Sequence, residues 1–256
     1  ADGTICLLQG FPGRVVRLHP DGTPAGDATY SQSAGSQGQF SVLIRGLSHP
    51  AGMVLAGIRM NFSGGSRSTQ NYFLSQCTGE GVQQLALLEK EHIIDYAEFE
   101  LDEMNMDFIW SRIAPGPAGK MIVAPDRAAM RFEVRSADGT LERIFARDYT
   151  NGTRTDEQRQ RARQIIEAVG ANYPTPPRNI TIEDSQAAVA GMWATDDGRL
   201  WVQSGNQESD LPDGTWALLD VYDSEGQFTQ QVALAGEHNR LKDAIFIQPD
   251  GRCVVV

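Results

Sequence analysis

The sequence predicts an all-β propeller of four-stranded antiparallel blades, six-bladed when complete, and two observations carry this prediction. One is a recurring turn, a small or acidic residue followed by glycine, between short strand-like runs. Such dipeptides supply the positive φ angles that tight two-residue hairpins need. The other is that two kinds of turn alternate, as a four-strand repeat requires. The turns are Asp2-Gly3, Asp21-Gly22, Ala51-Gly52, Glu80-Gly81, Ala118-Gly119, Asp138-Gly139, Asp197-Gly198, Glu225-Gly226 and Asp250-Gly251.

The first kind of turn joins two apolar strands, which we name a and b. It occurs within residues 47–56, 113–124, 191–202 and 244–255.

The second kind joins a strand of alternating polarity, c, to an outer strand, d. It occurs within residues 14–23, 131–140 and 219–227. An alternation of period two is typical of a sheet with one face open to solvent.

In this phase the chain contains strands b-c-d, then a-b-c-d three times, then a-b, which is about four and a half blades. A closed ring hides its edge strands, whereas this chain starts and stops inside a blade. We therefore expect residues 1–256 to form a single propeller domain that is an excerpt of a longer chain or has lost flanking segments.

Two inserts interrupt the repeat, an acidic one at residues 89–107 and one at 148–186 that contains a helix. Thr155 is the predicted N-cap, and Gln158 completes a capping box. Gly170 is expected to end the helix. Its predicted apolar face is Ala162, Ile165, Ile166 and Val169.

Composition and charge argue against several classes of function. The formal net charge of −11 argues against nucleic acid as the main partner. No apolar run approaches the roughly 20 residues that span a bilayer. Cys6, Cys77 and Cys253 form no CxxC pair, which argues against a structural zinc site. We expect buried free thiols, with a single disulfide as the alternative.

Three segments resemble a known family. Residues 221–226 (VYDSEG) and 197–202 (DGRLWV) are similar to the c–d and a–b turns of NHL-type and six-bladed β-propeller repeats of bacterial exported proteins. Residues 35–40 resemble the glycine-rich segment after an outer strand, without its usual proline and acid. The resemblance implies the fold and an extracytoplasmic location, periplasmic or secreted; it leaves the activity open.

In a propeller, the b–c and d–a loops gather at one end of the central channel. Here the b–c loops are residues 9–14, 57–70, 125–130 and 203–213, and d–a connections lie near Glu91, Asn151 and His238. Polar residues just after the b strands are therefore the candidates for ligand binding; the alternative is an ordinary solvated rim. The candidates are Arg59, Asn61, Asp126, Arg127, Gln203, Asn206 and His238.

A metal site is a second interpretation of the same loops. Propeller lactonases hold a calcium-like ion in the channel with Glu, Asn and Asp. Asn61, Asp126 and Asn206 come from three successive blades at comparable positions, and a hard cation needs several such oxygens. No catalytic residue is predicted, and no GxSxG motif is present.

These patterns favour a non-catalytic ligand-binding or protein-interaction module of an exported bacterial protein. Its partner would be a protein or small molecule at the channel mouth. One alternative is a calcium-dependent lactonase or esterase-type hydrolase with a metal in the central channel. Another is a structural subunit of a larger assembly.

Overall fold

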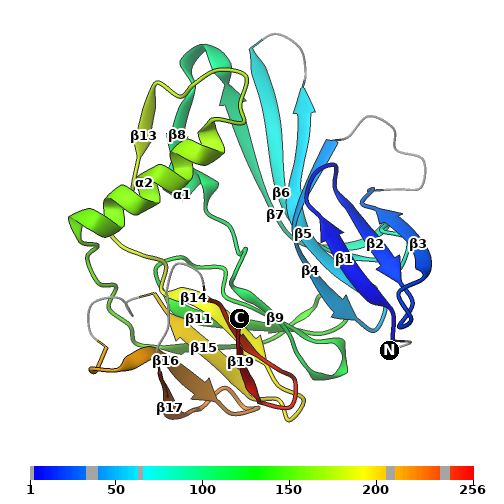
Figure 1. The fold of residues 1–256 in the computed structure, drawn as a ribbon, viewed down its shortest axis with the longest axis vertical. Helices are drawn as coiled ribbons and strands as arrows, with labels where there is room; N and C mark the ends of the chain where they lie inside the picture. The colour runs from blue at the N-terminus through cyan, green and yellow to red at the C-terminus, as the bar shows by residue number, and fades with distance from the viewer. Residues whose placement is uncertain (1–2, 33–39, 63–65, 206–210, 237–242) are drawn as a thin grey trace. The chain divides into compact units, whose positions relative to one another are not determined.

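The computed structural model describes residues 3–32, 40–62, 66–205, 211–236 and 243–256 (Figure 1). The chain divides into two compact units. Unit 1 comprises Ala1–Trp110 and Arg163–Thr181, and unit 2 comprises Ser111–Ala162 and Ile182–Val256.

Unit 1 contains two antiparallel meanders. The first is a three-stranded sheet in the order β1-β2-β3, and the second is a four-stranded sheet in the order β4-β5-β6-β7. Their strands are β1 (Ile5–Gln9), β2 (Arg14–Leu18), β3 (Pro24–Thr29), β4 (Phe40–His49), β5 (Gly52–Phe62), β6 (Arg67–Cys77) and β7 (Gln83–Asp95).

The two sheets of unit 1 pack face to face (Figure 1). Val15 and Ala28 of the first sheet are buried against Leu55 and Phe73 of the second. Tyr30, just after β3, stacks on Phe73 with ring centroids 4.1 Å apart. This core is the contact expected between neighbouring blades.

A small parallel pair, which the sequence did not predict, completes unit 1. β8 (Glu100–Asp102) pairs with β13 (Asn179–Thr181). The one-turn helices Tyr96–Glu98 and α1 (Glu103–Met106) flank β8. The predicted acidic insert 89–107 begins inside β7, so its first residues lengthen the sheet before the chain reaches β8.

Unit 2 contains two complete four-stranded meanders and one hairpin. The sheet orders are β12-β11-β10-β9, β14-β15-β16-β17 and β18-β19. The strands are β9 (Ile113–Pro115), β10 (Met121–Val123), β11 (Met130–Arg135), β12 (Leu141–Arg147), β14 (Val189–Ala194), β15 (Leu200–Ser204), β16 (Thr215–Tyr222), β17 (Phe228–Ala235), β18 (Ile245–Ile247) and β19 (Cys253–Val255), with a tight 3₁₀ turn at Pro117–Gly119.

The core of unit 2 lies between its two complete meanders. Fully buried Phe132 of β11 faces Tyr222 of β16, with ring centroids 5.4 Å apart. Met192 and Val202 join the same cluster. On the far face of β14–β17, Ile245 and Ile247 of β18 pack against Trp201 and its neighbours.

The described strands therefore follow the predicted phase of b-c-d, three times a-b-c-d, and a-b. The prediction of an all-β fold built from antiparallel propeller blades is confirmed. Local chemistry explains it, because each hairpin places a glycine where the backbone needs a left-handed residue. All nine turn glycines have positive φ.

Most of these turns differ in size from the predicted two-residue hairpins. In the β2–β3 turn, the Gly22 amide donates to the His19 carbonyl, and the His19 amide donates to the Thr23 carbonyl. Three residues thus separate the paired ends, and only the glycine is left-handed. This is a type I turn followed by a glycine bulge. Ala118 is the exception, since it is the one described non-glycine residue with positive φ.

The helix α2 (Asp156–Gly170) has the predicted start. The Thr155 amide donates to Gln158 Oε1, and the Gln158 amide donates to Thr155 Oγ1. Its predicted apolar face is only partly right: Ile166 is buried, whereas Ile165 is 60% exposed. Gly170 has no left-handed backbone; a side chain there would collide with Leu101.

The three cysteines are free, as predicted, but only Cys77 is buried. Burial raises the pKa of the Cys77 thiol to about 12. The expectation of burial is wrong for Cys6 and Cys253, because they lie on β1 and β19, whose residues are mostly exposed.

Candidate functional site

Two of the predicted ligand-binding residues, Arg59 and Asn61, line one cavity in unit 1, which we name the polar pocket. Its volume is about 200 Å³. Both residues lie on β5, two positions apart, so their side chains share a face of the sheet. The other lining residues are Gln32, Met60, Asn71 and Glu89.

Arg59 is the best-held side chain of the polar pocket. Only 7% of it is exposed, and its Nη2 donates to Glu89 Oε1 at 2.5 Å. Its guanidinium carbon lies 5.5 Å from the centre of the Phe73 ring, within cation–π range. Arg59 is therefore fixed from two sides.

Three other predicted residues, Asp126, Arg127 and Gln203, lie in unit 2 and do not line the polar pocket. Asp126 Oδ1 accepts a hydrogen bond from the Ala128 amide. Arg127 Nη2 donates to the Ser185 carbonyl at 3.1 Å. Gln203 pairs with Leu219 in the sheet. The first two hold a loop in place.

The predicted metal ligands are not tested as a set. Asn61 belongs to unit 1 and Asp126 to unit 2. Asn206 and His238 lie outside the described residues. Among the residues that are described, no group of three or more His, Cys, Asp or Glu side chains is arranged to hold a metal ion. Calcium stays a prediction from the sequence.

One further placement is wrong: Glu91 was expected in a connection between blades, but it lies within β7, opposite Asn71. Asn151 does lie in a connection, where its side-chain amide donates to the Ala128 carbonyl.

A second and larger cavity lies in unit 2 between its two complete meanders, and we name it the acidic cleft. Its volume is about 580 Å³. Three turns border it: Pro117–Gly119, residues 196–198 and residues 223–225. The first two are a–b turns and the third is a c–d turn. Ligand binding was predicted at the b–c and d–a loops, so the cleft lies at turns that were not predicted to bind a ligand.

The floor of the acidic cleft is apolar. Ile122, Val134 and Leu200 belong to the buried core of unit 2 and also line the cleft. Phe145 packs against this core, with its ring 5.0 Å from that of Phe132. Ile122, Val134 and Leu200 are almost fully buried, so Phe145 is the partly exposed part of the floor.

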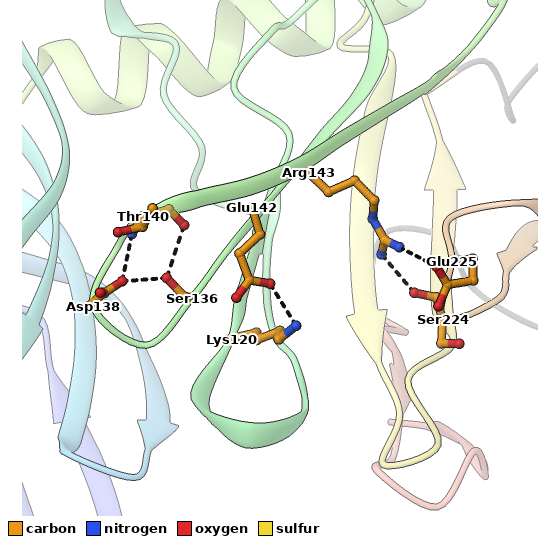
Figure 2. Close-up of polar contacts among 8 residues, drawn as sticks. All are labelled: Lys120, Ser136, Asp138, Thr140, Glu142, Arg143, Ser224 and Glu225. Carbon is orange, nitrogen blue, oxygen red and sulfur yellow. Dashed lines mark hydrogen bonds and ion pairs between the residues drawn. The ribbon is translucent and has the colours of Figure 1, made fainter.

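The rim of the acidic cleft is charged. Two cations stand against five carboxylates, which leaves a formal charge of −3 at neutral pH. Lys120 Nζ pairs with Glu142 at 2.7 Å. Arg143 reaches across to the neighbouring meander, where it donates to the Ser224 carbonyl at 2.7 Å and pairs with Glu225 (Figure 2). Both cations are therefore already occupied.

The remaining carboxylates differ in what surrounds them. Thr195 donates to Asp197 at 2.5 Å, and with Arg199 this bond holds the pKa of Asp197 below its ordinary value. Within the described ranges, Asp223 accepts hydrogen bonds only from the backbone amides of residues 225 and 227. The Asp196 side chain has no partner among the described residues. Asp196 and Asp223 therefore present uncompensated negative charge to the cleft.

The sequence did contain a signal for this cleft. Asp197 and Glu225 belong to the predicted turns Asp197-Gly198 and Glu225-Gly226, and this pattern indicates hairpins but no cleft. The cleft itself depends on how two meanders pack, which no local pattern encodes.

No protein-family model matches the chain, and no curated protein matches it either. Over the described part of the chain, no helix is long and apolar enough to cross a membrane.

Proposed function

We propose that this protein is a non-catalytic binding module and that its acidic cleft holds a basic, partly apolar segment of a partner protein. One observation carries the proposal: an apolar floor lies beneath a rim with surplus negative charge. The volume of about 580 Å³ falls in the range typical of ligand sites.

Charge complementarity selects the partner. An arginine or lysine of the bound segment would approach Asp196 and Asp223, whose charges no described cation offsets. An acidic segment would meet net repulsion from the same rim. Apolar side chains of the segment would cover the partly exposed Phe145 and the exposed Pro117, where burial contributes about 25 cal/mol per Å².

The cleft is also held in shape before any partner binds. The Arg143 bonds to Ser224 and Glu225 tie the two meanders together at the rim. Binding to a preformed site avoids the entropy loss of ordering it.

Isothermal titration calorimetry tests this with two peptides, acetyl-Arg-Leu-Arg-Leu-amide and acetyl-Glu-Leu-Glu-Leu-amide. We expect the basic peptide to bind, more weakly as salt is added, and the acidic one not to bind. The proposal would be overturned if both peptides bind with equal affinity or if neither peptide binds.

A matched pair of variants locates the contact. Asp196→Asn removes one charge from the cleft, and an exposed ion pair is worth about 0.2–1 kcal/mol. The basic peptide should therefore bind up to about fivefold more weakly. Glu157→Gln removes one exposed charge from α2 in the same unit and should change nothing. Equal effects of the two variants would indicate attraction by net charge alone.

A location outside the cytoplasm and a relationship to bacterial six-bladed propeller repeats remain predictions from the sequence, separate from this proposal.

A further inference from the structure

The polar pocket of unit 1 combines groups that a structural ion pair does not need. Arg59 and Asn71 lie directly opposite each other on β5 and β6, and Glu89 faces Phe73 from β7. With Asn61, these side chains project from one face of the sheet around a single cavity. All but Met60 of the lining residues are polar, and the carboxamides can both donate and accept.

Arg59 and Glu89 are each only partly used. The guanidinium is buried, but Nη2 alone has a hydrogen-bond partner among the described residues, and Nε has none. Glu89 binds Arg59 through Oε1, while Oε2 accepts nothing from the described part of the chain. A buried cation with unused donors is costly unless something else satisfies it.

The charges of the pocket balance, so its field favours neither a net anion nor a net cation. A ligand that carries both signs can meet both partners at once. Its carboxylate would accept from Arg59 Nη1, and its ammonium would donate to Glu89 Oε2. Such charge-assisted hydrogen bonds are roughly twice as strong as those a neutral polyol could make.

We propose that the polar pocket binds a small α-amino acid as its zwitterion. An α-amino acid carries both charges on one carbon, which suits a single ion pair. The cavity of about 200 Å³ and its polar walls favour a small or polar side chain, such as that of glycine or serine. The carboxamides of Asn61 and Asn71 would take the remaining hydrogen bonds.

Calorimetric titration of the whole protein with glycine and L-serine tests this, against acetate, methylammonium and glycerol as partial mimics. The amino acids should bind with a millimolar or tighter dissociation constant, and each mimic at least tenfold more weakly. If acetate or glycerol binds as tightly as glycine, the site is an anion or polyol site. If none binds, the proposal is wrong.

Variants keep the test specific. Glu89→Gln retains an oxygen for Arg59 but removes the charge that faces the ammonium, so amino-acid binding should weaken at least tenfold. Glu80→Gln removes an exposed charge from the β6–β7 turn of the same unit, and Glu80 does not line the pocket, so this variant should bind like the wild type. Equal loss in both variants would contradict the assignment. Titration with the basic peptide reports separately on the acidic cleft.

Discussion

Replacing Gly226 by alanine tests how the two complete meanders of unit 2 fit together. Gly226 lies in the β16–β17 turn with φ +79°. A Cβ at this position would lie 2.6 Å from Cγ of Phe145, which belongs to the neighbouring meander and lines the acidic cleft. The phenyl ring therefore occupies the space that only glycine leaves open.

Two costs should add in Gly226→Ala. A left-handed backbone costs a non-glycine residue about 1–2 kcal/mol, and forcing a methyl group into a packed ring costs about 1–3 kcal/mol. Gly251→Ala is the matched control in the same unit. Its φ is +83°, but its nearest atom, Nη2 of Arg199, lies at an ordinary contact distance of 3.5 Å. Only the backbone cost applies to Gly251→Ala.

Urea unfolding, followed by the fluorescence of the three tryptophans of β14–β16, measures both variants. Gly226→Ala should lose about 1–3 kcal/mol more unfolding free energy than Gly251→Ala. In the Gly226→Ala/Phe145→Leu double variant, part of that excess should disappear, because the ring is gone. Equal losses in the two single variants would refute the packing of Phe145 on Gly226.

Three further predictions concern single features. Burial raises the pKa of the Cys77 thiol to about 12, so Cys77 should resist a thiol reagent in the native protein. Two thiols should react before denaturation and three after it. Reaction of all three thiols in the native protein would contradict the burial of Cys77. Thr155→Ala should destabilise α2 by about 1 kcal/mol in urea unfolding, whereas no change would mean that the capping box contributes nothing. The Ser136 hydroxyl and the Thr140 amide hold the pKa of Asp138 below the ordinary 3.8 (Figure 2). The stability difference between wild type and Asp138→Ala should therefore be complete above about pH 4 and shrink as the pH falls below 3.8; a difference independent of pH would contradict this.

The strand order was predictable because the local signals agree with the fold. A glycine after Asp21, Asp138 or Asp197 marks a hairpin, and alternating polarity marks the strand that leads into it. The three-residue form of these turns was not predictable, since the same dipeptide serves both turn sizes. The pairing of β8 with β13 was also not predictable, because short strands far apart in sequence carry no shared pattern.

The sites divide in the same way. Arg59 and Asn61 are predicted as candidates because they follow the apolar part of one strand. They do line the polar pocket, and ligand binding by them stays a prediction. Glu89 was missed as their partner, since its contact with Arg59 depends on the register of two neighbouring strands. The acidic cleft arises where two meanders meet, so no single stretch of sequence contains it.

Chemical-shift mapping tests the central claim, that the acidic cleft is a recognition site, most directly. Isotope-labelled protein would be titrated with acetyl-Arg-Leu-Arg-Leu-amide while its amide resonances are followed. We predict the largest shifts at residues 118–120, 142–145, 196–198 and 223–226. Shifts confined to other parts of the chain, or none at saturating peptide, would contradict the account.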